Sequence, residues 1–384
     1  MSRPKTYPLL PFSRLVYDMT RWMPDVYSFP FTFCWHGAAK HKQQVEDAIR
    51  QAIANHPVFE MKTDWRGQHY PAPLRDNLHG QYHDIRLYTD DDDLYIHSRA
   101  SRILGDGESG RIFLEDVLHA YQGEPLAKDD YWGYLEYVEQ QKQSKHYADS
   151  KAWLESEFSD LSIPVHPNLD RHLWTLLPPK PGLYKTDYSD LQDKINQLAE
   201  TEFLSMDGFF SLCAGLAIAE YCGTDAVALT WAYEGREREE EQRIFGSLHR
   251  DIPFLIRKSK IENRKSELIR EARNQIRSGI AHSDYPYTLT APYNQRWNYA
   301  VNVLRIPEPE AIMSLLPKEL ELLPPPEQKI AYALLDVEIH ETQEKLILCY
   351  RYSATHYKIE SIRRFAGLVR KYAEWLVKDY LPTD

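Results

Sequence analysis

The sequence predicts a mixed α/β protein made of two successive lobes, each with a sheet flanked by helices. Its 384 residues leave room for two domains of ordinary size. Short runs typical of strands alternate with segments whose apolar residues recur at helical spacing, and this order restarts in the second half. Between the halves, residues 161–183 contain five prolines and are the best candidate for a linker. We therefore expect an N-terminal lobe over 1–160 and a C-terminal lobe over 184–384.

Composition and charge narrow the classes of function. Hydrophobic residues make up 43% and charged residues 27% of the chain, so a packed core is expected. The net charge of −11 argues against a nucleic-acid partner, which needs a basic surface. The four cysteines are dispersed without CxxC or Cys/His zinc spacing, so no metal site is expected. With no signal-peptide pattern and no apolar segment of membrane-spanning length, we expect a cytoplasmic protein without a membrane partner.

Residues 94–121 organise the predicted N-terminal lobe. They read as a strand of alternating apolar and polar residues, a Gly105-Asp106-Gly107 turn and a helix. Asp106 stands where its carboxylate can accept backbone N–H groups at the start of a helix beginning near Glu108. Five apolar side chains at helical spacing are expected to face the core: Phe113, Leu114, Val117, Leu118 and Tyr121.

The other elements of this lobe follow from apolar periodicity and from breaking residues. The four prolines between residues 7 and 30 predict a loop rather than a helix before the first strand. Helix 41–55 should bury Val45, Ala48, Ile49, Ala52 and Ile53 and end at the His-Pro pair that follows. The predicted elements are strands at 31–35, 59–63 and 69–71 and helices at 41–55 and within 129–161.

The second half is predicted in the same way. A capping-box pattern at 189–192 opens a helix, and the apolar segment 206–221 is typical of a buried one. Residues 330–340 and 345–352 predict a hairpin, and 307–326 is an irregular Pro-rich segment. The remaining predicted elements are strands at 184–188, 226–232 and 297–306 and helices at 265–278 and 359–378.

The stretch Ser101-Arg102-Ile103-Leu104-Gly105-Asp106-Gly107 resembles the HHxxxDG motif of condensation domains in nonribosomal peptide synthetases, members of the chloramphenicol acetyltransferase-like superfamily. Asp106 and Gly107 are in place, but Ser101 and Arg102 replace the two histidines, so the motif is degenerate. Weaker similarities follow in the family's order over nearly the whole chain. They lie in His56-Pro57-Val58-Phe59-Glu60, with Glu60 at a usual arginine position, in the helix around Tyr147 and Trp153, and in Ile244–Phe254, with Arg250 at a usual asparagine position.

This resemblance implies two lobes arranged in a V, with a tunnel between them that receives the phosphopantetheine arms of carrier proteins. It implies no tightly bound cofactor, because the phosphopantetheine arm or an acyl-CoA carries the substrate. The expected partners are a peptidyl or acyl carrier protein domain and, in one branch of the family, a tailoring enzyme. The candidates for the tunnel wall are His249, Arg250, Asn298 and Asn302.

Arg102 decides which function the altered motif can serve. In the family the second histidine helps the acceptor amine attack the donor thioester, which needs a group with a pKa near neutral. A guanidinium stays protonated and has no acceptor lone pair, so Arg102 cannot be a base, although it can stabilise an oxyanion. Two functions remain open: a carrier- or partner-binding domain without standard His-dependent amide formation, and an acyltransferase acting on an amine or alcohol with Arg102 as oxyanion stabiliser.

The charges around the motif also have two interpretations. Glu60 is either the ion-pair partner of Arg102, with Asp106 and Gly107 shaping the helix start, or a solvent-facing strand residue. His97 lies five residues before Arg102, so the alternation of a strand puts it on the opposite face. We interpret the HxxxD pattern from His166 to Asp170 as chance, because it lies in the Pro-rich linker.

Overall fold

The structure is a computed structural model that describes residues 5–21, 27–160, 162–171, 179–257, 265–286, 300–306, 316–324 and 329–380. It contains two compact units, each built from separate parts of the chain. The first comprises Met1–Lys142, Glu234–His249 and Pro309–Glu327, and the second comprises Gln143–Tyr233, Arg250–Glu308 and Gln328–Asp384. The first unit thus takes two segments from the region that sequence analysis assigns to the C-terminal lobe. The boundaries 1–160 and 184–384 stay a prediction.

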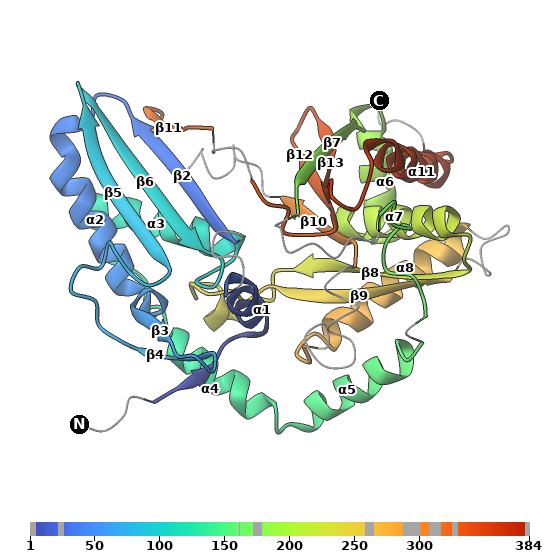
Figure 1. The fold of residues 1–384 in the computed structure, drawn as a ribbon, viewed down its shortest axis with the longest axis horizontal. Coiled ribbons are helices and arrows are strands. Elements are labelled where there is room, and N and C mark those ends of the chain that lie inside the picture. The colour runs from blue at the N-terminus through green and yellow to red at the C-terminus, as the bar shows by residue number, and fades with distance from the viewer. Residues whose placement is uncertain are drawn as a thin grey trace. The chain divides into compact units, whose positions relative to one another are not determined.

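The first unit is built on a four-stranded antiparallel sheet (Figure 1). Its strand order is β11 (Leu320–Leu322), β2 (Ser28–Trp35), β6 (Asp93–Ser101) and β5 (His83–Asp90). A smaller sheet has the order β1 (Tyr7–Pro8), β4 (Gln68–Pro71) and β3 (Met61–Thr63). The short edge strand β11 comes from a segment almost three hundred residues after β2, so sequence proximity gives no hint of this pairing.

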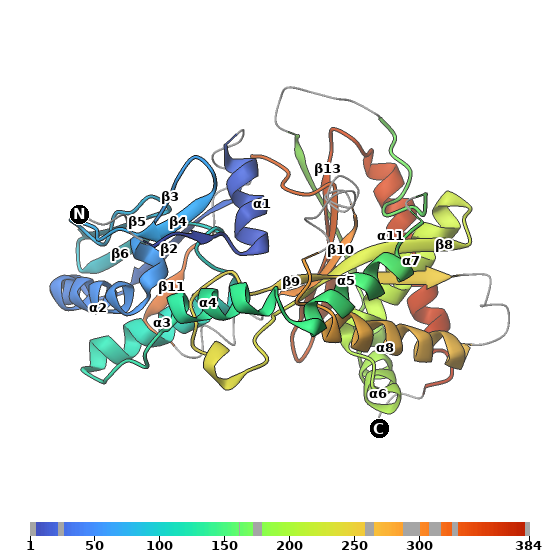
Figure 2. The same cartoon turned by 90° about the horizontal axis from the view of Figure 1, so that it is seen from below.

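Four α-helices accompany these sheets among the residues described: α1 (Pro11–Thr20), α2 (Lys42–Asn55), α3 (Gly107–Gln122) and α4 (Tyr131–Gln141). Helices α2 and α3 lie side by side on one face of the four-stranded sheet (Figure 1, Figure 2). α2 buries the five residues predicted for its inner face. Short 3-10 turns lie at η1 (Ala39–His41), η2 (Pro57–Glu60) and η4 (Glu239–Glu241).

One prediction for this unit is wrong, and another holds only in part. The expected N-terminal loop contains helix α1, whose Pro11 occupies the first helical turn, where a missing N–H leaves no hydrogen bond unmade. The five residues of α3 predicted to face the core are half-buried, and the fully buried face of α3 carries Ser109, Ile112, Asp116 and Ala120. This face is buried because Ser109 and Asp116 have buried polar partners. The spacing of apolar residues does not predict such partners.

The second unit is built on a six-stranded mixed sheet. Its order is β7 (Pro181–Asp187), β13 (Leu346–Ser353), β12 (Leu335–Glu341), β10 (Asn302–Ile306), β8 (Ala226–Tyr233) and β9 (Arg250–Arg257). β10 runs parallel to β8 and β12, and the other neighbours are antiparallel. The predicted hairpin is confirmed as β12 and β13, whereas β9 was not predicted.

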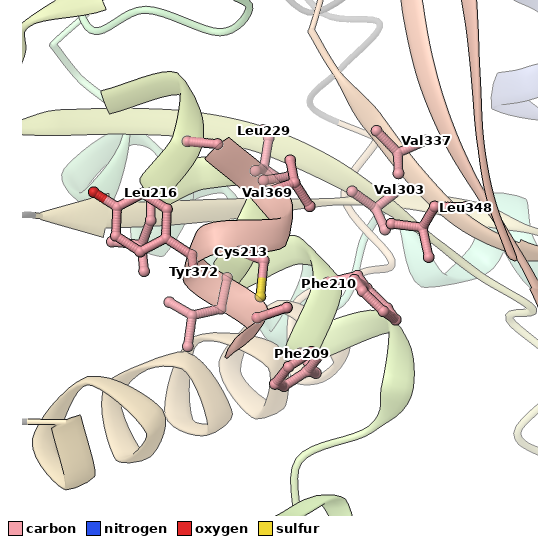
Figure 3. Packing of buried hydrophobic residues seen from close by; sticks show 14 of the residues in the cluster. Phe209, Phe210, Cys213, Leu216, Leu229, Val303, Val337, Leu348, Val369 and Tyr372 are labelled. Atoms are coloured by element: carbon pink, nitrogen blue, oxygen red, sulfur yellow. The ribbon is translucent and has the colours of Figure 1, made fainter. Parts of the chain in front are cut away.

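The core of this unit forms around one buried helix, α7 (Met206–Cys222). Figure 3 shows Phe209, Phe210, Cys213 and Leu216 of α7 among side chains from β8, β10, β12, β13 and α11 (Ile359–Val377). Because α7 is apolar almost all round, it can be covered on every side. The described part of this unit also contains α5 (Lys145–Glu157), η3 (Ser189–Leu191), α6 (Gln192–Glu202) and α8 (Lys265–Ala281).

The described residues contain no single helix that is long and apolar enough to cross a membrane. Residues 189–202 together with α7 meet the length and composition requirement only as a pair bent by 105°.

Candidate functional site

The turn after β6 is shaped by a reciprocal cap at the start of α3. The Asp106 carboxylate accepts the Ser109 backbone N–H at 3.0 Å, and the Asp106 backbone N–H donates to the Ser109 hydroxyl at 3.2 Å. This is a capping box, which satisfies two N–H groups that a helix start otherwise leaves without partners. Asp106 therefore has the capping role expected from the sequence.

Asp106 also forms a buried ion pair with Arg236, which sequence analysis missed. Two guanidinium nitrogens of Arg236 donate to the two carboxylate oxygens at 2.9 and 3.0 Å, and the side chains are only 2% and 7% exposed. Arg236 also donates to the backbone carbonyls of Ile244 and Gly246. Burial raises the pKa of Asp106, but the charge and hydrogen bonds of Arg236 outweigh it and hold the pKa below its ordinary value.

The same carboxylate fixes the segment that follows Gly246. The backbone N–H groups of Leu248 and His249 donate to Asp106 at 2.9 and 3.1 Å. Asp106 thus joins the turn before α3 to the 244–249 segment, which lies more than 130 residues later in the chain. The only sequence signal for this contact was the family-like segment around Phe245, and nothing in it pointed to Arg236.

A second buried charge cluster lies beside the first and centres on His56. Its Nδ1 lies 2.8 Å from Asp129 and its Nε2 lies 3.1 Å from Asp116, and all three side chains are almost fully buried. Arg243 pairs with Asp116, and the Phe245 N–H donates to Asp129. Burial lowers the pKa of His56, but the two carboxylates together raise it above its ordinary value. This cluster therefore joins α2, α3 and the 243–245 segment through buried charges.

Arg102 lies in the turn directly after β6, close to Phe12 and His249. The guanidinium carbon lies 6.0 Å from the centre of the Phe12 ring. The His249 ring packs on the same phenyl group edge-on, with the ring centres 4.0 Å apart. We call these three side chains the Arg102–Phe12–His249 group. Helix α1 is held beside this group because the Ser13 hydroxyl donates to the Ile103 carbonyl at 2.9 Å.

His249 is the proton-accepting side chain of this group. Burial lowers the pKa of His249 to about 4; Asp106 opposes this shift, while the positive charges of Arg102 and Arg236 add to it. The imidazole is therefore neutral at pH 7 and keeps one acceptor nitrogen. The structure thus places His249 beside Phe12 and close to Arg102, and its place in a tunnel wall stays a prediction. A base with so low a pKa accepts protons only weakly at neutral pH.

Ser101 faces a polar pocket within the first unit. The pocket has a volume of about 480 Å³ and is lined by backbone and side chains of β2, β5, β6 and the loop before β5. Arg86, Arg99 and His79 contribute basic side chains to its wall. Asp84 lines the pocket too and pairs with Arg86 at 2.9 Å and with His79 at 2.6 Å. Ser101 therefore borders a pocket whose wall carries charges of both signs.

The structure places the other predicted site residues on several different elements. Glu60 ends η2 and is half-buried, and its pairing with Arg102 stays a prediction. Gly107 begins α3, and a Cβ there would meet nothing within 4 Å, so packing does not require glycine. Arg250 and Asn302 belong to the second unit, where Arg250 donates to the Ser283 hydroxyl at 2.7 Å. Asn298 lies outside the described residues.

Two further histidines considered from the sequence have ordinary partners. His97 on β6 contacts the Thr32 hydroxyl of β2 at 3.0 Å. In the HxxxD pattern, Asp170 accepts the Lys358 N–H and the Ser361 hydroxyl at the start of α11, and His166 lies near Tyr357. His166 and Asp170 therefore act separately in this structure.

Comparisons with known proteins identify what this chain resembles. A sequence model described as the condensation domain matches residues 85–380. The structure is similar to the epimerization domain from the third module of tyrocidine synthetase B, with 14% identity and a TM-score of 0.74 over 98% of this chain and 97% of that one. VibH, an NRPS condensation enzyme, gives 14% identity and a TM-score of 0.75 over 96% of each chain. No curated protein matches the sequence.

Structures of the same fold have been obtained with partners. The X-domain from teicoplanin biosynthesis, in complex with OxyB, gives 13% identity and a TM-score of 0.74 over 98% of this chain and 94% of that one. A mutant starter condensation domain of rhizomide synthetase, in complex with C8-CoA, gives 16% identity and 0.73 over 98% and 96%. At these identities the structural matches establish the fold, and they confirm the predicted mixed α/β class.

Proposed function

This chain belongs to the condensation-domain family, and we propose that it binds a carrier protein or a partner enzyme of a peptide-synthetase system without standard His-dependent amide formation. The observation that carries this proposal is the difference between two residues of the motif, Asp106 and Arg102. The buried ion pair of Asp106 with Arg236 and its capping box hold the turn in place, which supports a folded binding surface there. Arg102, which cannot accept a proton, stands where the family places its catalytic histidine.

The partner chemistry follows from the polar pocket at Ser101 and from the family. A carrier protein presents its acyl group on a phosphopantetheine arm, whose phosphate is an anion. Arg99 lines the pocket with a guanidinium, the donor that suits a phosphate best, whereas Arg86 in the same wall pairs with Asp84. The complex of the X-domain with OxyB supports a partner-binding role for a domain of this fold.

A binding titration tests this proposal. A carrier domain bearing the phosphopantetheine arm should bind the wild-type chain more tightly than the same carrier without the arm. Arg99→Gln should weaken binding of the loaded carrier, whereas Arg66→Gln, an exposed arginine outside the pocket, should leave it unchanged. Equal binding of both carrier forms, or no effect of Arg99→Gln, would count against the pocket as the site for the arm.

A second candidate function is acyl transfer assisted by Arg102, which the Arg102–Phe12–His249 group favours. In this account Arg102 stabilises the oxyanion as the amine or alcohol attacks, and proximity supplies most of the rate. Wild type should then transfer acyl groups from a panel of carrier-bound or CoA-bound donors. Arg102→Ala should lose about 10²–10³-fold in rate. Arg102→Lys should recover only part of it, because a point charge does not reproduce the planar guanidinium.

A further inference from the structure

A cluster of metal-ligating side chains lies at the end of the four-stranded sheet, away from the motif turn. It contains Cys34 and His36 from the end of β2, Asp93 from the start of β6, and Glu321 from β11. Strand register brings them together, since Cys34 pairs with Glu321 on one side and with Tyr95 on the other. Because side chains alternate along a strand, positions 34, 36, 93, 95 and 321 all project from one face.

The distances within the cluster match the spacing of tetrahedral zinc ligands. The Cys34 Sγ lies 3.7 Å from His36 Nδ1 and 3.9 Å from Asp93 Oδ2, and these last two atoms are 3.0 Å apart. With ordinary Zn–S, Zn–N and Zn–O bond lengths and tetrahedral angles, such ligand atoms lie about 3.4–3.6 Å apart. Each observed separation is thus within a few tenths of an ångström of the required one.

The surrounding hydrogen bonds orient two of these ligands. The Gly37 backbone N–H donates to Asp93 Oδ1 at 2.9 Å, which leaves Oδ2 directed at the cysteine and the histidine. Gly37 has φ +70°, a conformation that glycine adopts readily, and this turn places its N–H. On the far side of the imidazole, Glu321 Oε2 lies 3.3 Å from His36 Nε2. A carboxylate on the second ring nitrogen is the arrangement that fixes metal-bound histidines.

From this geometry we propose that Cys34 Sγ, His36 Nδ1 and Asp93 Oδ2 bind a divalent ion of the zinc class, with Glu321 holding the imidazole from outside. A thiolate and a carboxylate balance the two positive charges of the ion, and the neutral imidazole adds none. Three protein ligands leave one tetrahedral position for water or another small ligand. The site joins β11 to β2 and β6, so binding fixes the edge strand of the sheet. This inference is independent of the function proposed above.

Sequence analysis found no zinc pattern because the three proposed ligands are not spaced like those of a zinc motif. Cys34 and His36 have the two-residue spacing of a strand, and Asp93 lies 57 residues after His36.

Cobalt(II) titration tests the site directly, because a Co²⁺ ion bound by a thiolate has a sulfur-to-metal charge-transfer absorption. Full-length protein treated with EDTA and freed of the chelator should bind one Co²⁺ with this band, and Zn²⁺ should abolish the band by displacement. Cys34→Ser should lose the band, and His36→Gln should weaken binding strongly. Glu321→Gln should weaken it about 10–100-fold, the usual effect of losing such an outer carboxylate.

Two matched variants act as controls. Cys222→Ser removes a thiol outside the cluster, and His79→Gln removes an imidazole that lies between two carboxylates but has no thiol beside it. Both should keep the wild-type band and affinity. Absence of a thiolate band in wild type, or a band that persists in both Cys34→Ser and His36→Gln, overturns the proposal. His36 is more than half exposed, so its variant decides the matter if Cys34→Ser fails to fold.

Discussion

The first unit buries more charged side chains than the second, in which Asp336 and Glu338 are buried. In the first, the Asp106–Arg236 pair and the His56–Asp116–Asp129 cluster lie inside the fold and hold α3 against segments from elsewhere in the chain. In the second, the core around α7 is apolar, with Phe209, Phe210 and Leu216 fully buried. A buried charge depends on one partner in one geometry, whereas an apolar side chain shares its contacts among many neighbours. The first unit should therefore be the more sensitive to single substitutions of polar residues.

The largest effect is expected from removing the guanidinium of the buried pair. Arg236→Ala leaves the Asp106 carboxylate buried without its charge partner, which costs about 3–5 kcal/mol of unfolding free energy. Urea denaturation measures this loss. Arg66→Ala, at an exposed arginine on Trp65, should change stability by less than about 0.5 kcal/mol. A loss below 1 kcal/mol for Arg236→Ala would show that the pair does not hold this unit together.

The matched substitution in the second unit is Leu216→Ala. This fully buried side chain of α7 should cost about 2–5 kcal/mol, the transfer free energy of its methyl groups plus the cavity they leave. Leu216→Met nearly conserves volume and should cost less than about 1.5 kcal/mol. Equal losses of unfolding free energy in the two variants would show that this core depends on the exact shape of Leu216 and not only on its volume. The core of the second unit would then be as sensitive to one side chain as the buried ion pair of the first.

The pH dependence of stability separates the two kinds of buried histidine. The pKa of His56 is raised by its carboxylates, so its stabilisation is fully present below pH 6.5 and is lost as the pH rises through the folded pKa. Burial lowers the pKa of His69 to about 4, so protonation of the unfolded state costs stability as the pH falls from 6.5 towards 4. The stability difference between wild type and His56→Gln should therefore shrink from pH 6 to pH 9.

The difference between wild type and His69→Gln should instead change between pH 6.5 and pH 4, with wild type losing stability faster. Chemical denaturation across this range measures both. A difference for His56→Gln that grows with pH would contradict the charged state assigned to this cluster.

The smallest effect is expected at two glycines that have equal room for a side chain. A Cβ at Gly107 or at Gly123 would meet nothing within 4 Å, but only Gly123 has a positive φ, of +77°. Gly107→Ala should stabilise the chain by about 0.4–1 kcal/mol through the unfolded state, and Gly123→Ala should destabilise it. Thermal melting of the two variants checks this. A loss of stability in Gly107→Ala would show that the backbone at this position requires glycine.

Burial of apolar side chains could be predicted from the sequence, whereas burial of polar side chains could not. The inner face of α2 follows from apolar spacing, and the structure buries the five residues that this spacing indicated. The face of α3 could not be predicted in this way, because Ser109 and Asp116 are buried for the sake of partners far along the chain.

Some residues of the candidate site could be predicted from the sequence, and others could not. The turn with Arg102 and Asp106 was recognisable, because its residues are contiguous and resemble a known motif. Arg236 was invisible, since an arginine in a charged loop has no pattern that predicts burial. The metal-ligating cluster was also missed, because it is assembled by the pairing of three strands and not by spacing within one segment.

The central claim is that the motif keeps the structural contacts of Asp106 but has Arg102 in place of a catalytic base. An assay of amide formation by the wild-type chain tests this claim most directly. One carrier domain loaded with an acyl or peptidyl donor and another loaded with an aminoacyl acceptor would be incubated with the chain. Intact mass spectrometry would then follow the acceptor carrier. The account predicts no condensed product above the reaction without protein, and little gain from Arg102→His, because Ser101, Glu60 and Arg250 also depart from the family pattern. Rapid product formation by wild type, and equally by Arg102→Ala, would contradict it.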